Sequence, residues 1–234
     1  MNEFLLIVTL LCVYGGVLLA YRFFGKTGLY CFTVFATITA NIEVLIMVNA
    51  FGMEQTLGNI LFASTFLVTD ILSETEGRKE AGRAVTIGIC TSAFFILLSQ
   101  SWLLYQPSQS DWASASFQVI FSNTPRLLFA SLLVYAVSQR FDVWAYHKWW
   151  DFTTKKFGDS RKMLWLRNNG STLISQLLNT VLYTFGAFLG MYTMQVLISI
   201  CISSYIIFVV TSLLDTPFVY LARQIAEKRE GSVK

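Results

Sequence analysis

Apolar residues in this chain fall into long continuous blocks, without the narrow stripes that mark a helix exposed to water. Each block approaches the roughly 20 residues that a helix needs to cross the hydrocarbon core of a bilayer. We distinguish seven, at residues 4–21, 28–51, 57–73, 84–105, 125–146, 171–194 and 196–222. Helices are required because unpaired backbone groups in lipid cost several kcal/mol each. The pattern predicts an all-α, polytopic transmembrane bundle that forms a single domain over residues 1–234.

The number of spans depends on the block at 57–73, which is the shortest and the most polar. If it crosses the membrane the chain has seven spans, and if it is re-entrant it has six. Sixteen of the 17 Lys and Arg residues fall in inner connections when the N-terminus is placed outside, and Arg126 is the exception. This asymmetry follows the positive-inside rule and favours seven crossings, with the C-terminus in the cytoplasm.

Composition narrows the class of protein further. Hydrophobic residues make up 55% of the chain and charged residues 13%, about half the charge of an average soluble domain. The net charge of +3 is explained by membrane orientation, so we expect the lipid bilayer as a partner and no nucleic acid. The chain contains no GxSxG, HExxH, Walker or GxGxxG motif and no cysteine–histidine cluster. We therefore predict neither an enzyme nor a metal or cofactor site, and a protein of the cell membrane.

Two connections are long enough to carry structure of their own. The outer one, at about 106–124, is polar with an apolar middle, and we expect a loop with a short helix. The inner one, at about 147–167, interleaves Trp and Phe with Lys and Arg, which is typical of a segment lying on the cytoplasmic leaflet. Gly186-x-x-x-Gly190 would let another helix approach closely, either within the chain or in a homodimer.

Polar residues within the apolar blocks are the strongest functional signal, because an ionised side chain at mid-bilayer costs about 2.5–3.5 kcal/mol. Asn41 and Glu43 lie in the second block, where Glu43 is expected at mid-depth. Asp70 and Glu74 are four residues apart and so share a helix face. Two of these acids also have a structural interpretation. Glu43 could be a carboxylate bonded to a neighbouring helix, and Glu74 could belong to a helix end paired with Arg78.

The fifth and sixth blocks add a second polar set. Gln139 and Asp142 lie on the fifth, with Arg126 at its outer end. The sixth carries a hydrogen-bonding stripe that includes Ser175, Gln176, Asn179 and Tyr183. A helix–helix interface explains the hydroxyl side chains, but it explains the amides less well.

Three stretches resemble the signatures of the queuosine precursor transporter family. They are "FLVTDILSETEGRKEAGRAV" from Phe66, "RLLFASLLVYAVSQRFDV" from Arg126 and "RNNGSTLISQLLNTVLYTFGAF" from Arg167. The resemblance covers roughly residues 30–222. This chain departs from the family pattern at Asn179, where an acid is expected, and after Asn41, where a lysine is expected.

The resemblance implies import of a 7-deazaguanine base (preQ0, preQ1 or queuine) for salvage in tRNA modification. Such a ligand presents N–H donors and carbonyl acceptors on a flat ring. We expect Glu43 to read the base edge and Asn41, Gln176 and Asn179 to orient it. Tyr183 or Phe185 would stack on the ring. Asp70, Glu74 and Arg126 would shape gates or helix ends.

How transport would be driven stays open at this level. A facilitator, a proton symporter that uses Glu43, and the substrate-binding membrane subunit of a vitamin-type ECF importer with external ATPase partners all fit the sequence. A non-transporting membrane scaffold is the alternative from another class, although it leaves the buried acid and amides unexplained.

Overall fold

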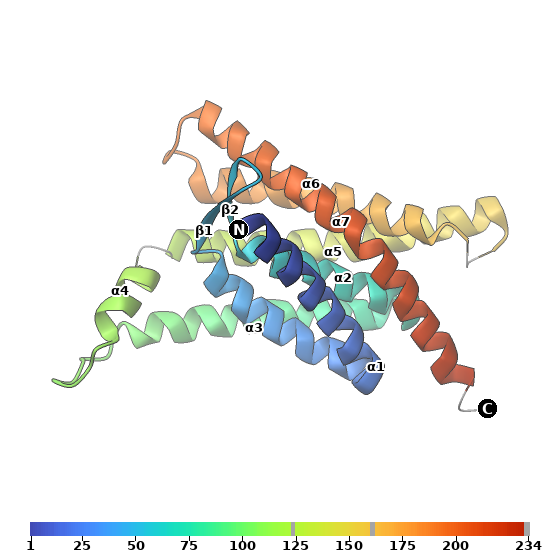
Figure 1. Ribbon diagram of the computed structural model, residues 1–234, viewed down its shortest axis with the longest axis horizontal. Coiled ribbons are helices and arrows are strands. Elements are labelled where there is room, and N and C mark those ends of the chain that lie inside the picture. Colours follow the sequence, from blue (N-terminus) through green and yellow to red (C-terminus); the bar gives the residue numbers. More distant parts are fainter. Residues whose placement is uncertain (123–124, 160–161, 232–234) are drawn as a thin grey trace.

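The computed structural model describes residues 1–122, 125–159 and 162–231, and it confirms an all-α helical bundle with one small hairpin (Figure 1). The elements in chain order are α1 (Asn2–Glu43), β1 (Met47–Ala50), β2 (Met53–Thr56), α2 (Gly58–Thr75), α3 (Arg78–Trp102), α4 (Ser114–Ser122), α5 (Pro125–Phe157), α6 (Leu164–Phe188) and α7 (Met194–Gly231). The short outer helix expected within 106–124 is present as α4.

Helix α1 consists of two antiparallel segments that reverse direction at Gly25, which has φ 61° and ψ −144°. The second segment returns so closely that a Cβ on Gly28 would lie 2.2 Å from the carbonyl oxygen of Ala20. Asn2 at the start of α1 donates a 2.9 Å hydrogen bond to the carbonyl of Asn49 in β1. The apolar blocks at 4–21 and 28–51 therefore contribute separate segments.

The prediction that 28–51 is helical throughout is wrong in its last third. Helix α1 ends at Glu43, and β1 pairs antiparallel with β2 from Met47↔Thr56 to Ala50↔Met53. Phe51 and Gly52 turn the hairpin with φ of 53° and 72°. Two positive φ values in a two-residue loop define a type I′ turn, whose twist matches that of the strands.

Most of the segment at 147–167 is helical, because α5 continues to Phe157 and α6 begins at Leu164. One further prediction needs correction. The Gly186-x-x-x-Gly190 pattern does not lie on one helix, because α6 ends at Phe188 and Gly190 has φ 84°. This pattern therefore gives no support to a homodimer.

The bundle exposes many large apolar side chains and buries several polar ones beside its apolar core. Phe94 and Leu97 on α3 are each 66% exposed, whereas Asp70, Gln139 and Asp142 are fully buried. By length and composition three helices in the described chain could cross a membrane: Asn2–Glu43, Arg78–Trp102 and Met194–Arg229. The other long helices, α2, α5 and α6, carry many of the polar residues.

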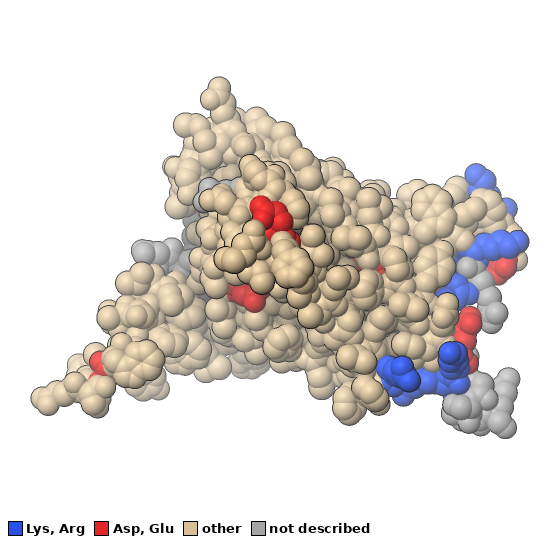
Figure 2. Space-filling view, in the orientation of Figure 1, with Lys and Arg blue, Asp and Glu red and all other residues tan. Residues whose placement is uncertain are grey.

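The two ends of the bundle differ in charge. We call the end that holds the N-terminus, β1 and β2 the hairpin end, and the opposite end the basic end. At the basic end Arg229 of α7 donates to the carbonyl of Tyr21, close to the Gly25 turn. Figure 2 shows Lys and Arg gathered at the basic end, where α7 ends and α5 meets α6.

Helix α2 occupies the centre of the bundle. Fourteen residues are buried among the 18 of α2, including Asp70 and Ser73. It packs against α1, α3, α5 and α7. Gly58 at its start permits close approach to α1, because a Cβ there would lie 2.8 Å from the backbone nitrogen of Val44. The short, polar block at 57–73 is thus an uninterrupted helix whose polar side chains face protein.

Candidate functional site

A cavity of about 720 Å³ lies in the half of the bundle next to the hairpin. Its wall comes from α1, both strands, α2, α3, α5, α6 and α7. The polar side chains of the wall are amides and hydroxyls, among them Asn41, Gln55, Asn59, Ser131, Tyr135, Asn179, Thr180 and Tyr183. Phe62, Phe188, Tyr192 and Phe208 add aromatic surface. None of the described side chains in the wall is charged, so the cavity suits a neutral, hydrogen-bonding, flat molecule.

Three residues singled out from the sequence meet in this cavity: Asn41, Asn179 and Tyr183. The amide nitrogen of Asn41 donates to the carbonyl of Thr37 at 2.8 Å and to Ser92 Oγ at 3.3 Å. Asn41 is 7% exposed and Asn179 is 6% exposed. Both amides therefore present hydrogen-bonding atoms to an enclosed space, where an unpaired polar group is costly until a ligand or water pairs with it.

Glu43 is not in the cavity wall. It is the last residue of α1 and only half-buried, because the helix stops there and the chain turns into the hairpin. The expectation of a mid-depth acid assumed a helix running to residue 51. Phe185 also lies outside the wall, so Tyr183 is the aromatic residue of that pair positioned to stack on a ligand.

The hairpin supplies cavity residues that the sequence did not reveal. Gln55 on β2 is 7% exposed and lines the cavity, together with Gly52 at the turn and Asn59 at the start of α2. The signal that was available is Gly52, because glycine readily adopts the positive φ that this turn requires. It was hidden because the residues before it extend an apolar block.

A hydrogen-bonded layer closes the cavity on the side of the basic end. Gln139 Nε2 donates to Thr65 Oγ1 at 2.7 Å, and Thr69 Oγ1 donates to Gln139 Oε1 at 3.4 Å. Thr65 itself lines the cavity. Gln176 is also buried near this level, and its Oε1 has no hydrogen-bond partner in the described structure. Gln139 and Gln176 therefore lie behind the cavity wall, not in it.

Beyond this layer three carboxyl groups converge from three helices. Thr172 Oγ1 donates to Asp70 Oδ2 at 2.9 Å, and Ser175 Oγ donates to Asp142 Oδ1 at 2.7 Å. Asn168 Nδ2 donates to Asp215 Oδ1 at 2.7 Å. The predicted residues Asp70 and Ser175 thus meet here, below the cavity. These acids are at most 1% exposed.

An ion pair completes the series toward the basic end. Arg167 holds Glu74 with two hydrogen bonds, from Nε at 2.9 Å and from Nη2 at 2.5 Å. Tyr146 donates to the same carboxylate at 2.7 Å, and Arg223 approaches it at 3.3 Å. Glu74 is therefore part of a charge-paired helix end, but its cationic partners come from α6 and α7, and the expected Arg78 is not among those of the described structure.

Arg126 was also expected near the site. Its backbone belongs to α5, and its side chain lies outside the described part of the structure.

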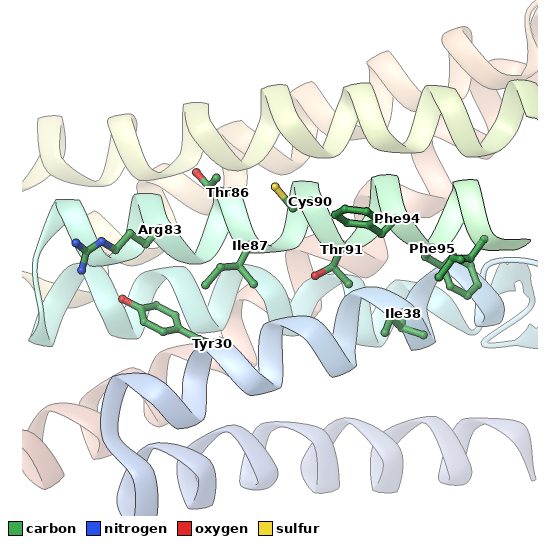
Figure 3. Close-up of a pocket in the computed structure, with 10 residues that line it drawn as sticks. Tyr30, Ile38, Arg83, Thr86, Ile87, Cys90, Thr91, Phe94 and Phe95 are labelled. Carbon is green, nitrogen blue, oxygen red and sulfur yellow. The ribbon is translucent and has the colours of Figure 1, made fainter.

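A second hollow of about 620 Å³ runs along the surface between the second segment of α1 and α3 (Figure 3). Tyr30 and Ile38 come from α1, and Arg83, Phe94 and Phe95 lie along α3. The hollow is open and mainly apolar, and no amide lines it. Its polar side chains include Tyr30 and Arg83, which both bond to Glu80, so the cavity with its several amides is favoured as the binding site.

Comparison with known proteins identifies the family of this chain. The family described as "Putative vitamin uptake transporter" matches residues 56–222, from the end of the hairpin through Asp215 on α7. The "Probable queuosine precursor transporter" of Bacillus subtilis (strain 168) is 39% identical over 216 residues, which is 92% of each chain. No solved structure matches. The chain is thus a multi-pass membrane transporter, and it belongs to the queuosine precursor transporter family.

Proposed function

We propose that the protein imports a 7-deazaguanine base of the preQ0, preQ1 or queuine type for tRNA modification salvage. The observation that carries this proposal is the 720 Å³ cavity lined by amides, hydroxyls and aromatic rings. A volume of this size is ordinary for a small-molecule site. The name of the Bacillus subtilis relative supports the same substrate class.

The polar wall offers a physical account of base recognition. The guanine-like edge presents adjacent N–H donors and a carbonyl acceptor, and a side-chain amide supplies one acceptor and two donors. Asn41 and Asn179 lie on α1 and α6, and Gln55 lies on the hairpin, so a base between them would be held from three elements. The rings of Tyr183 or Phe62 would cover a face of the base. In this arrangement the side-chain amides read the base edge, which is the role first expected of Glu43.

We also infer seven crossings, with the N-terminus outside and the C-terminus in the cytoplasm. The two segments of α1, together with α2, α3, α5, α6 and α7, alternate between the hairpin end and the basic end. Lys and Arg gather at the basic end, which the positive-inside rule assigns to the cytoplasm (Figure 2). The cavity then lies in the outer half of the membrane, and the Glu74–Arg167 pair lies near its inner surface.

Binding tests this function most directly. Purified protein is expected to gain thermal stability with preQ0, preQ1 or queuine and none with an equal concentration of uracil. Replacing Asn179 by leucine removes a cavity amide and is expected to weaken binding by about tenfold. The matched control is Gln106→Ala, because Gln106 is an exposed amide in the connection before α4. Protein that binds none of the three bases would refute the proposal.

Uptake gives the second test. Cells that lack their own base synthesis and express this chain are expected to acquire queuosine in tRNA from nanomolar external base, and cells with Asn179→Leu to need more. Uptake of labelled base into proteoliposomes that hold this chain alone separates an autonomous transporter from a subunit that needs ATPase partners. A scaffold would support neither.

A further inference from the structure

The buried acids below the cavity have more negative charge than their neighbours can balance. Asp70 on α2, Asp142 on α5 and Asp215 on α7 are each at most 1% exposed. In the described structure none of the three forms an ion pair with Lys or Arg. The nearest guanidinium, that of Arg167, is already bound to Glu74. Three ionised carboxylates in this environment would repel one another strongly.

The geometry of Asp70 and Asp142 shows where a proton would relieve this repulsion. Their carboxyl groups lie within hydrogen-bonding reach of each other. Asp70 Oδ1 and Asp142 Oδ2 have no hydrogen-bond partner in the described structure, while the second oxygens of the two acids accept from Thr172 and Ser175. Two carboxylates can only accept hydrogen bonds, so a contact between them requires one proton.

A neutral residue, Asn168, gives independent evidence that the acid cluster holds an acceptor without a hydrogen-bond donor. Asn168 is fully buried, and its amide nitrogen donates to Asp215, so the side chain is aimed into the cluster. Its Oδ1 has no partner. A buried acceptor of this kind is normally paired, which indicates that a proton donor, such as a water that relays protons, visits the cluster.

The other titratable groups that face the pair do not supply the proton. Tyr14 on α1 donates to the carbonyl of Thr211, and Tyr146 on α5 donates to Glu74. Glu74 on α2 and Arg167 on α6 neutralise each other. Asp215 on α7 is a third buried carboxyl group, and its Oδ1 accepts from Asn168. The Asp70–Asp142 contact is therefore the place where a proton stabilises the cluster most.

The pair also lies on a route from the cavity to the basic end. Thr65 lines the cavity, and Asp70 follows it by five residues, or about 8 Å along α2. Gln139, bonded to Thr65 and Thr69, occupies the gap. On the far side, Glu74 lies one helical turn beyond Asp70.

We propose that Asp70 and Asp142 carry the proton that drives base uptake, so that the protein is a proton symporter; this rests on the proposed function. The proton enters from the cavity side with the base and is held between Asp70 and Asp142. It leaves toward the cytoplasm when the base is released. No redox partner or nucleotide is needed. Because the buried pair cannot lose its last proton without placing two adjacent charges in a closed core, release waits for water from the inner side.

Proteoliposomes that hold this chain alone test the proposal, with preQ0 as the neutral substrate and the membrane potential clamped by valinomycin and equal K⁺. An outside pH one unit below the inside pH is expected to drive about tenfold accumulation at one proton per base. A trapped pH dye is expected to report lumenal acidification upon preQ0 addition. Asp142→Asn is expected to lose both signals while it still gains thermal stability with preQ0.

The matched control is Asp151→Asn, an exposed acid on the same helix, which is expected to leave both signals unchanged. Glu43→Gln tests the competing acid and is expected to keep proton coupling. Wild-type protein that equilibrates preQ0 without moving protons would overturn the proposal and leave the proposed function standing. Protein that neither binds nor moves any base would instead refute the proposed function. If Asp142→Asn fails to fold, the wild-type dye signal decides alone.

Discussion

Gly88 on α3 is a position where a single methyl group should deform the substrate cavity. A Cβ built there would lie 2.0 Å from the hydroxyl oxygen of Tyr135 and 2.8 Å from its Cζ. Tyr135 is 4% exposed and lines the cavity. Ordinary contacts to a Cβ begin at about 3.4 Å. The Tyr135 ring must therefore move by more than 1 Å in the Gly88→Ala variant.

The magnitude follows from two opposing contributions. Alanine is a better helix former than glycine by roughly 0.5–1 kcal/mol, which favours the variant. Overpacking of a filled core costs typically about 1–3 kcal/mol, which opposes it. We expect a net loss of about 1–2 kcal/mol in the free energy of unfolding. Because Tyr135 forms part of the wall, its displacement should also weaken base binding.

Gly82→Ala is the matched control on the same helix. A Cβ on Gly82 meets nothing within 4 Å, so only the propensity gain remains and the protein should become slightly more stable. The assay is thermal unfolding of both purified variants with and without preQ0. If Gly88→Ala is as stable as Gly82→Ala and binds preQ0 like the wild type, the placement of Tyr135 against α3 is wrong.

Three further predictions concern other parts of the molecule. Arg167→Met leaves the Glu74 carboxylate buried and short of a partner, and it should lower the free energy of unfolding by about 3–5 kcal/mol. In a double-mutant cycle, adding Glu74→Gln should restore part of this loss. In competition binding, neutral preQ0 should bind more tightly than the preQ1 cation, because no described side chain in the cavity wall is charged. Hydrogen bonds from Ser114 and then Ala113 lower the pKa of the Asp111 carboxyl, outside the membrane, below its ordinary 3.8. This support of α4 is present above pH 3.8 and lost as the pH falls through the lowered value, which Trp112 fluorescence should report.

The sequence predicted the helices well because block length is a direct consequence of bilayer thickness. It failed at 44–51 for the same reason, since Leu45, Ile46 and Met47 are as apolar as a helical span requires. The feature that distinguishes these residues from a helical span is the turn at Phe51 and Gly52, where two positive φ values favour a hairpin. This error also misplaced Glu43. Its expected depth was counted along a helix running to residue 51, but the helix ends at Glu43 itself.

The candidate site was partly predictable because helix periodicity places residues on a common face. Asn179 and Ser175 are one turn apart, and the structure places one in the cavity and the other on the acid below it. Partners far apart in the chain were not predictable. Arg167 lies 93 residues from Glu74, and nothing in the spacing distinguishes it from Arg78, which is only four residues away.

The vertical order of the polar groups suggests why the transporter would keep charge away from its substrate. The cavity holds amides, the layer below holds Gln139, and carboxylates begin only at Asp70 and Asp142. On the proposed mechanism the base is recognised by neutral hydrogen bonds, while the proton is held at Asp70, about 8 Å along α2 from the cavity residue Thr65. Separating the two ligands lets their coupling depend on whether the Gln139 layer opens, without direct contact between base and acid. On this account, Gln139→Leu should leave preQ0 binding almost unchanged but reduce the proton movement that accompanies uptake.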